Sequence, residues 1–158
     1  MLWAFAKWME ATSLGVAIRN SQYAFPIVEF FHLAALAFIG GAVLIVDMRL
    51  LGIGLRKTPV AELARDAQPW VTGSLMVMIV SGVCLFASEA TKCYESTAFW
   101  IKISALIVVM IFTYTVRRKV ALDDERHVSA LTQKCAALVS VSLWFTVAWG
   151  GRWIGIGG

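Results

Sequence analysis

The chain has 158 residues, of which 59% are hydrophobic and 15% are charged, and its formal net charge is +4 at pH 7. A soluble domain of this length has a large surface, which needs more polar cover than this composition supplies. The composition therefore excludes an ordinary soluble domain and indicates a protein of the lipid bilayer.

Residues 1–20 are expected to form an amphipathic helix in the membrane interface. Lys7 and Glu10 interrupt the apolar run that a cleaved signal peptide needs, and no basic segment precedes it. The apolar residues of this segment fit one face of a helix, with Trp3 and Trp8 at headgroup level. A loosely ordered tail is the alternative.

Four later stretches have the roughly 20 apolar residues that a spanning helix requires. They are residues 23–46, 70–88, 98–117 and 130–150. Two of them contain continuously apolar runs, residues 75–80 and 106–112, whereas the strands of a membrane barrel alternate polar and apolar residues. We therefore predict an all-α protein, an integral membrane four-helix bundle in which residues 1–158 form one transmembrane domain. Pro69 is expected to open the second helix, and the sequence shows no convincing internal repeat.

Basic residues gather around the first and third connections between these helices. The first connection is flanked by Arg49, Arg56, Lys57 and Arg65, and the third by Arg117, Arg118, Lys119, Arg126 and Lys134. By the positive-inside rule these connections face the cytoplasm, so both termini are expected to be periplasmic in a bacterial inner membrane. The bilayer thus explains the positive charge, and we expect no nucleic-acid partner.

Each predicted helix collects its polar and small residues on one face, which we expect to point into the bundle. These faces carry Glu29, His32, Gly40 and Asp47; Gly73, Ser81, Cys84 and Ser88; Phe99, Lys102 and Thr113; and Cys135, Ser142, Thr146, Trp149 and Trp153. His32 and Lys102 each lie roughly 8 to 9 Å inside the outer helix ends, at a rise of ~1.5 Å per residue. Two nitrogen bases are therefore expected in one layer of the membrane.

This layer is the candidate site, and its predicted cofactor-binding residues are His32, Lys102, Glu29, Cys84, Thr146 and Trp149. A neutral imidazole is a strong ligand for haem iron or a transition metal, and a buried lysine can serve as a neutral ligand or a proton carrier. The structural alternative is that His32 hydrogen-bonds across helices while Lys102 extends to the headgroups or pairs with Glu29 or Glu89.

The remaining candidate ligands are weaker. His127 follows an acidic run and is expected on the cytoplasmic surface, on the order of 20 Å from His32 in a core ~30 Å thick, which is too far to share one iron. Cys84, Cys93 and Cys135 show no paired metal-binding spacing. Cys84 and Cys135 are expected in the core, and Cys93 in the outer loop, where it is free to react or to pair with a partner.

The run from Ser21 to Pro26, followed by Glu29, His32, Gly40 and residues 47–52, resembles the signature of an uncharacterised family of small bacterial four-helix membrane proteins, a domain of unknown function. The resemblance extends through Pro69, Gly73, Gly82, Phe99 and Lys102 and covers most of the chain. It implies the fold and brings no established activity.

A looser similarity connects His32 and Trp100-Ile101-Lys102 to the bacterial haem-dependent protoporphyrinogen oxidases. Those proteins are also small four-helix membrane proteins, with a histidine early in one helix and a tryptophan-x-lysine pattern in a later one. The chain departs from that family at Ile39 and in the spacing from His32 to Arg49. The similarity implies a haem-binding histidine and does not extend to the substrate.

We therefore expect a membrane redox or cofactor-binding protein, in which His32 binds b-type haem or a metal near the periplasmic leaflet. A quinone or a periplasmic redox protein is the expected electron partner. The alternatives are a proton-linked transporter module for small molecules or ions, and a non-catalytic assembly subunit that associates with itself or with other chains. The sequence leaves open whether the chain is an enzyme.

Overall fold

The computed structural model describes residues 2–54, 57–123 and 128–156, with side chains described as far as Arg152. The secondary structure of these residues is helical, which confirms the all-α prediction. In chain order the elements are α1 (Leu2–Glu10), α2 (Ser13–Asn20), α3 (Ala24–Leu50), α4 (Val60–Ser88), α5 (Ala90–Glu95), α6 (Thr97–Phe112), η1 (Thr113–Arg117), α7 (Arg118–Leu122) and α8 (Ala130–Ile156). The element η1 is one turn of π-helix between α6 and α7.

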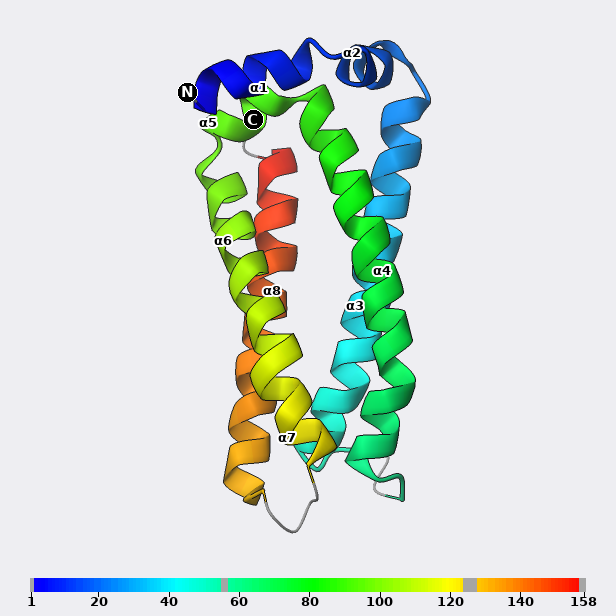
Figure 1. Ribbon diagram of the computed structural model, residues 1–158, viewed down its shortest axis with the longest axis vertical. Helices are drawn as coiled ribbons and strands as arrows, with labels where there is room; N and C mark the ends of the chain where they lie inside the picture. Colours follow the sequence, from blue (N-terminus) through cyan, green and yellow to red (C-terminus); the bar gives the residue numbers. More distant parts are fainter. Residues whose placement is uncertain (1, 55–56, 124–127, 157–158) are drawn as a thin grey trace.

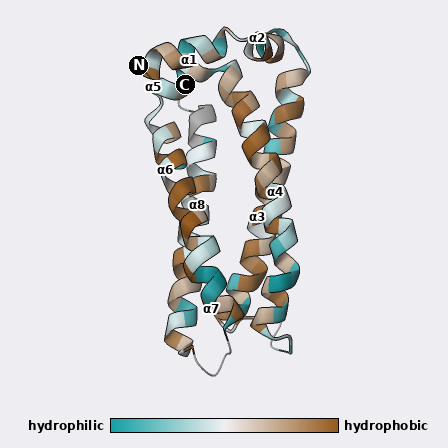
Figure 2. Ribbon diagram, in the orientation of Figure 1, coloured by the Kyte–Doolittle hydropathy of each residue, from teal (hydrophilic) through white to brown (hydrophobic). Residues whose placement is uncertain are grey.

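Four helical segments are long and apolar enough to cross a membrane: Ala24–Leu50, Val60–Ser88, Thr97–Leu122 and Ala130–Arg152. Apolar residues predominate in the middle of the bundle and polar residues gather at its ends (Figure 2). Large apolar side chains such as Phe30, Ile107 and Phe145 are exposed on the outside of the helices. Such a surface suits acyl chains, and the four-helix membrane fold predicted from the sequence is confirmed.

The bundle consists of two helical hairpins that face each other (Figure 1). α3 packs along α4, and α6 with its continuation packs along α8. Ile39 and Val43 of α3, Leu75 of α4, Val109 of α6 and Trp144 of α8 form the main apolar core between the hairpins. The core therefore lies on the interface between two similar halves.

The two hairpins repeat one burial pattern, although their residue identities do not reveal it. His32 lies 70 residues before Lys102, and Asp47 lies 70 residues before Arg117. Between these pairs the inward positions of the first helix of each hairpin also match at this interval, as Ala35 with Ala105, Ile39 with Val109, and Val43 with Thr113. The second helices match at an interval of 69 (140 minus 71), as Val71 with Ser140, Leu75 with Trp144, Met78 with Val147, and Ser81 with Gly150.

This pattern relates the hairpins by an approximate two-fold axis along the bundle. In a two-fold interface, a residue on the axis meets its own counterpart. His32 meets Lys102, and Asp47 meets Arg117. These two polar contacts between the hairpins therefore lie on the axis, toward opposite ends of the apolar core.

The second spanning helix begins at Val60, so the prediction that Pro69 opens it is wrong, and Pro69 lies inside α4. A proline inside a helix removes one backbone hydrogen bond and usually costs ~3 kcal/mol. The extra turns offset this cost because Val60, Leu63 and Ala67 pack against the end of α3 and against α7. The other predicted spans agree with the structure to within five residues at each end, apart from the longer end of α8.

The connection after α3 requires glycine. Gly52 has a φ of 79°, and the Ile53 amide donates to the Met48 carbonyl over 2.8 Å. This is the Schellman arrangement, in which a residue in the left-handed region ends a helix and is usually glycine. The turn fixes the end of α3 one turn after Asp47.

The amino-terminal segment forms two helices, α1 and α2, that lie across one end of the bundle (Figure 1). A single interfacial helix over 1–20 was expected, but the chain breaks at Thr12. Its hydroxyl accepts a hydrogen bond from the Gly15 amide and donates one to the Met9 carbonyl. This N-cap starts α2 in a new direction.

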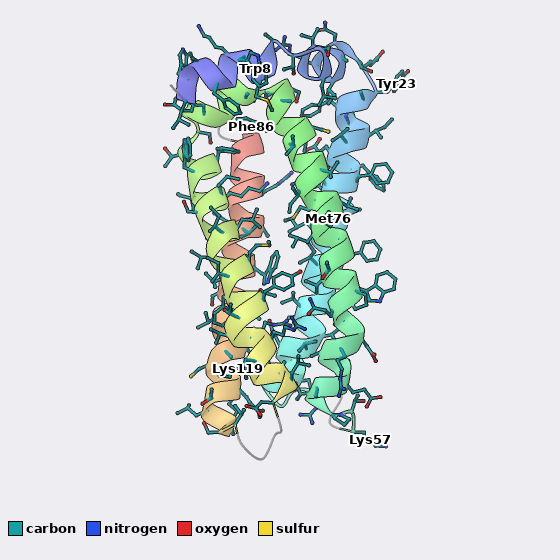
Figure 3. The ribbon with its side chains drawn as sticks, viewed as in Figure 1. Trp8, Tyr23, Lys57, Met76, Phe86 and Lys119 are labelled. Carbon is teal, nitrogen blue, oxygen red and sulfur yellow. The ribbon has the colours of Figure 1, made fainter. Side chains whose placement is uncertain are left out.

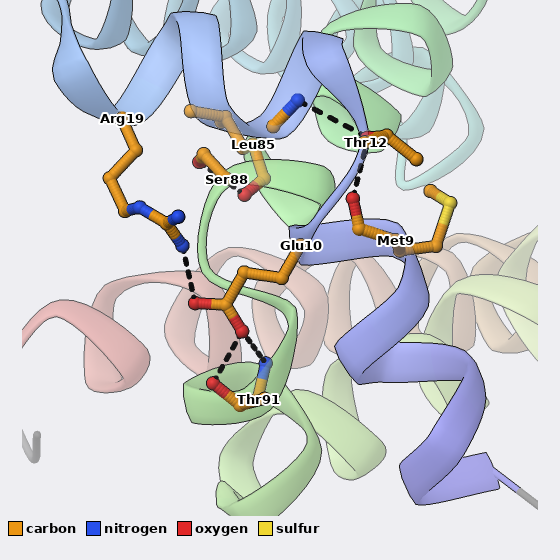
Figure 4. A network of polar contacts seen from close by, with 8 residues as sticks. Met9, Glu10, Thr12, Arg19, Leu85, Ser88 and Thr91 are labelled. Carbon is orange, nitrogen blue, oxygen red and sulfur yellow. Dashed lines mark hydrogen bonds and ion pairs between the residues drawn. The ribbon is translucent and has the colours of Figure 1, made fainter.

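A polar network fastens this segment to α5 (Figure 4). The Glu10 carboxylate accepts hydrogen bonds from the Thr91 hydroxyl at 2.6 Å and from Arg19 at 2.8 Å. The Thr91 hydroxyl bond, ahead of the Arg19 charge, lowers the pKa of Glu10. Residues far apart in sequence thus hold the amino-terminal segment in place.

Replacing Gly15 with alanine is expected to lift α2 from α4, because an added Cβ would overlap the Ala87 carbonyl oxygen. Crowding of this kind costs about 1 to 3 kcal/mol. Unfolding by denaturant in mixed micelles measures the loss. The matched control is Gly73→Ala, where a Cβ meets open space in a helix, so its stability should stay equal or rise. Equal effects of the two variants would contradict this contact.

Candidate functional site

The candidate site joins His32 of α3, Ser81 of α4 and Lys102 of α6. Nδ1 of His32 lies 2.9 Å from the Ser81 hydroxyl oxygen, and Nε2 lies 3.4 Å from Nζ of Lys102. The prediction that an imidazole and an amine from two spans meet inside the bundle is confirmed. Both hairpins contribute to the site, so its geometry depends on how they pack.

The hydrogen bonds of Ser81 determine the tautomer of His32. The Ser81 hydroxyl has one proton, and it donates that proton to the Val77 carbonyl over 2.6 Å. Its oxygen must then accept from His32, so Nδ1 carries the imidazole proton. Nε2 is left with a lone pair, which accepts a hydrogen bond from Lys102. Holding Nδ1–H with a second residue is the usual way in which proteins orient a histidine ligand.

Glycines on α4 and α8 make room for the two basic side chains. A Cβ at Gly82 would lie 3.3 Å from Cε1 of His32. A Cβ at Gly150 would lie 3.2 Å from Cβ of Lys102, and one at Gly151 would lie 3.4 Å from its Nζ. The lysine stem therefore lies along a glycine pair. All four spanning helices contribute to the site. The two bases come from α3 and α6, and the backbones of α4 and α8 approach them closely at the glycines.

Lys102 makes no ion pair among the described residues. Glu29 is exposed, and Glu89 pairs with Lys92 instead, at 3.9 Å. The alternative in which Lys102 pairs with one of these carboxylates or extends to the headgroups therefore does not match the structure. The lysine points inward, where a neutral imidazole is its partner.

The structure does not bring the other predicted residues into this group. Cys84 is half-buried, whereas Glu29, Thr146 and Trp149 are exposed. The predicted inward face of α8 is wrong, because the helix is rotated and instead buries Ser140, Trp144 and Val147; the side chain of Trp153 lies outside the described residues. Thr146 tolerates the outer surface because its hydroxyl donates to the Ser142 carbonyl over 2.9 Å.

Ser81 and the glycines are the site residues that the sequence analysis did not assign. Ser81 was on the predicted inward face, but its role needed the depth of His32 on the neighbouring helix. Gly150 and Gly151 form a pair at the depth of Lys102, which is a detectable signal because small residues permit close packing of membrane helices.

The cysteines and the second histidine do not extend the site. Cys135 is exposed, so its predicted burial is wrong. Burial raises the pKa of the Cys93 thiol, and the Glu89 charge adds to the rise, which reduces the reactive thiolate. His127 lies outside the described residues. Among the described residues, no three His, Cys, Asp or Glu side chains gather as a metal site.

The separation of the two bases limits what can lie between them. Metal–imidazole bonds are about 2 Å long, so two trans ligands of one metal stand about 4 Å apart. Nζ and Nε2 are 3.4 Å apart. One surface hollow, lined by Thr97, Trp149 and Gly150, borders the site from the outside, since Gly150 also packs against Lys102, and another lies apart from it against Phe38 and Trp70. A haem bound by both residues therefore requires their side chains to separate, whereas His32 alone can act as a ligand once Lys102 turns aside.

A second polar centre lies toward the other end of the bundle. Nε of Arg117 donates to the Asp47 carboxylate over 2.7 Å, and Nη2 donates to the Val43 carbonyl over 3.0 Å. Arg117 was predicted at the membrane flank, but it is buried. It lies in the π turn Thr113–Arg117, which inserts one extra residue and rotates the following side chains. The turn thereby aims the guanidinium at Asp47.

No curated protein and no solved structure matches the chain, so the looser similarity to protoporphyrinogen oxidases receives no support. A family match covers residues 5–157, which include both polar centres and all four spanning helices. The chain therefore belongs to DUF6644, a family of unknown function.

Proposed function

We propose that this chain is a membrane redox or cofactor-binding protein, in which Nε2 of His32 binds the iron of a b-type haem or a transition metal. The supporting observation is the hydrogen bonding of His32, from which we infer its tautomer. Ser81 holds the proton on Nδ1, so the nitrogen that faces the hairpin interface has a lone pair ready for a metal. A neutral imidazole oriented by a second residue is the form in which histidine binds metals.

Lys102 is proposed to assist as a ligand or as a proton donor. Its Nζ is in contact with the lone pair of His32, and its stem lies against Gly150 and Gly151. A lysine has a flexible four-carbon stem, so a small rotation frees Nε2. Electron exchange with a quinone in the bilayer or with a periplasmic redox protein is the proposed use of the bound group.

An optical spectrum of the purified protein, with metal analysis, tests the proposal. The protein is expressed with added haem precursor and extracted in mild detergent. We expect a Soret band or a bound transition metal near one per chain, and at least a tenfold loss in His32→Ala. A folded, membrane-inserted protein without either would overturn the proposal.

The matched control for His32→Ala is Glu29→Gln. Glu29 lies on the same helix one turn earlier and is exposed, so its substitution should leave cofactor content unchanged. Circular dichroism and gel filtration establish that both variants remain folded. Equal loss in both variants would assign the effect to the helix and not to the imidazole.

A second candidate is a proton-linked transporter, which the two polar centres on the hairpin interface favour. His32 and Asp47 are 15 residues apart (47 minus 32) on α3, or ~22 Å at ~1.5 Å per residue. Sites between parallel repeats are common in transporters. This candidate predicts pH-dependent flux in proteoliposomes that His32→Ala abolishes, with no bound cofactor in the wild-type protein.

We further propose that the end of the bundle with Lys57 and Lys119 faces the cytoplasm of a bacterial inner membrane. Lys57 and Lys119 lie at the end of the bundle opposite to Trp8 and Tyr23 (Figure 3). Basic residues prefer the cytoplasmic side. Alkaline phosphatase fused after Gly158 should be active and green fluorescent protein at the same position dark. The reverse result would invert the topology.

A further inference from the structure

The buried pair of Asp47 and Arg117 uses only some of the polar atoms around it. Oδ1 of Asp47 accepts from Arg117, whereas Oδ2 has no hydrogen-bond partner among the described residues. Asp47 is 0% exposed and Arg117 is 6% exposed. A buried carboxylate oxygen without a hydrogen bond is costly, especially in a low-dielectric interior.

Three further buried groups near this pair also lack a partner within the described part of the chain: the hydroxyls of Thr113 and Ser140 and the indole N–H of Trp144. The Ser140 hydroxyl lies close enough to the Asp47 carboxylate for a weak hydrogen bond from α8, but the two groups do not meet with the geometry of a full one. Thr113 lies one turn before Arg117, and Trp144 belongs to the same apolar cluster as Val43, whose carbonyl accepts from Arg117. Together with Asp47 of α3, these groups of η1 and α8 gather close to one ion pair.

We propose that this cluster is a binding site for internal water. The groups require a ligand that both accepts hydrogen bonds, from Trp144 and the hydroxyls, and donates one, to Oδ2 of Asp47. Water satisfies these needs, and buried waters typically make about three hydrogen bonds to such groups. One or two waters would convert the four unpartnered groups into a connected network.

The charges of the site favour a small neutral ligand. A cation would lie beside the guanidinium of Arg117, and an anion would lie beside the carboxylate of Asp47. The side chains around the cluster are at most 7% exposed, which leaves no path for a large molecule without separation of the hairpins. This inference does not depend on the proposed cofactor at His32.

Hydroxyl-radical labelling by synchrotron radiolysis, read by mass spectrometry, tests the inference on the full chain in nanodiscs. Radicals form from water, so a buried side chain is oxidised when water lies beside it. Trp144 and Met78 are both reactive, belong to the same apolar core and are similarly buried, at 7% and 3% exposure, but only Trp144 carries one of the buried polar groups without a partner. We expect Trp144 to be oxidised at least fivefold faster than Met78. Equal rates would overturn the proposal.

The double substitution Thr113→Val with Ser140→Ala removes two of the four groups and should lower the Trp144 rate at least threefold. The exposed Trp149 should keep its rate, which monitors the radical dose. Unchanged circular dichroism shows that the fold persists. If the variant is folded and Trp144 is still oxidised at the wild-type rate, its water comes from another source and the proposed site is rejected.

Discussion

Replacing Arg117 with alanine is expected to lower the free energy of unfolding by about 3 to 5 kcal/mol, because it leaves the Asp47 carboxylate charged, buried and without its partner. The guanidinium donates both to Asp47 and to the Val43 carbonyl. The substitution therefore leaves two buried acceptors without their donor at once. Denaturant titration of the protein in mixed micelles, followed by circular dichroism, measures the loss.

Arg118→Ala is the matched control. Arg118 is the next residue in the chain and is exposed, so its loss should change stability by less than ~0.5 kcal/mol. The pair of variants separates burial from the mere removal of a basic residue at this end of the bundle. Similar effects of Arg117→Ala and Arg118→Ala would mean that the buried ion pair does not stabilise the fold.

The double variant Asp47→Leu with Arg117→Met should recover most of the lost stability. Replacing both members of a buried ion pair with apolar residues is often neutral or stabilising, by up to ~4 kcal/mol. A stable double variant would show that Asp47 and Arg117 are not retained for stability. It would also remove the proposed water site, so radiolysis of Trp144 in the same protein should be slow.

The four spans were predictable because their signal is local. A bilayer demands long apolar helices, and composition alone reports them. The amphipathic character of the amino-terminal segment was predictable. The break between α1 and α2 was not, because it depends on one hydroxyl, that of Thr12, which acts as an N-cap. The start of α4 was missed because the packing of Val60 and Leu63 outweighs the local penalty of Pro69.

The part of the candidate site that follows from depth in the membrane was predictable. His32 and Lys102 were expected in one layer, and they meet. Rotation about the helix axis was not predictable for α8, where two opposite faces both carry small polar residues. The sequence has Ser142 and Thr146 on one face and Ser140 on the other, and backbone carbonyls can satisfy a lone hydroxyl on the lipid side. Only packing against the other hairpin distinguishes them.

The repeat between the hairpins was hidden for a related reason. A two-fold axis requires equal burial at equivalent positions, not equal residues. On the axis itself, identical charged residues would repel each other, so complementary ones are favoured. His32 facing Lys102 and Asp47 facing Arg117 meet that condition, one as a neutral base with an amine and the other as an ion pair. The residues of the two hairpins therefore differ most at the equivalent positions that lie on the two-fold axis.

The Ser81→Ala variant is expected to change how the imidazole proton of His32 is shared between Nδ1 and Nε2. In the wild-type protein the Ser81 oxygen accepts from Nδ1–H, because its own proton goes to the Val77 carbonyl. Without that acceptor only the Lys102 amine at Nε2 favours a proton on Nδ1, so the form with the proton on Nε2 gains population when the lysine turns aside. Nitrogen NMR of histidine-labelled protein measures the change directly, and the chain has only two histidines, so His32→Gln identifies the signal.

The same variant tests the proposed ligand role through a separate measurement. Loss of the residue that orients a histidine ligand typically costs 10- to 100-fold in metal affinity, which is about 1.4 to 2.8 kcal/mol. Ser81→Thr keeps the hydroxyl and should keep both the tautomer and the affinity. A change of tautomer without a change of affinity would reject His32 as the ligand while leaving the hydrogen-bond geometry intact. An unchanged tautomer would reject Ser81 as the residue that sets the tautomer and would assign that role to Lys102, which contacts Nε2.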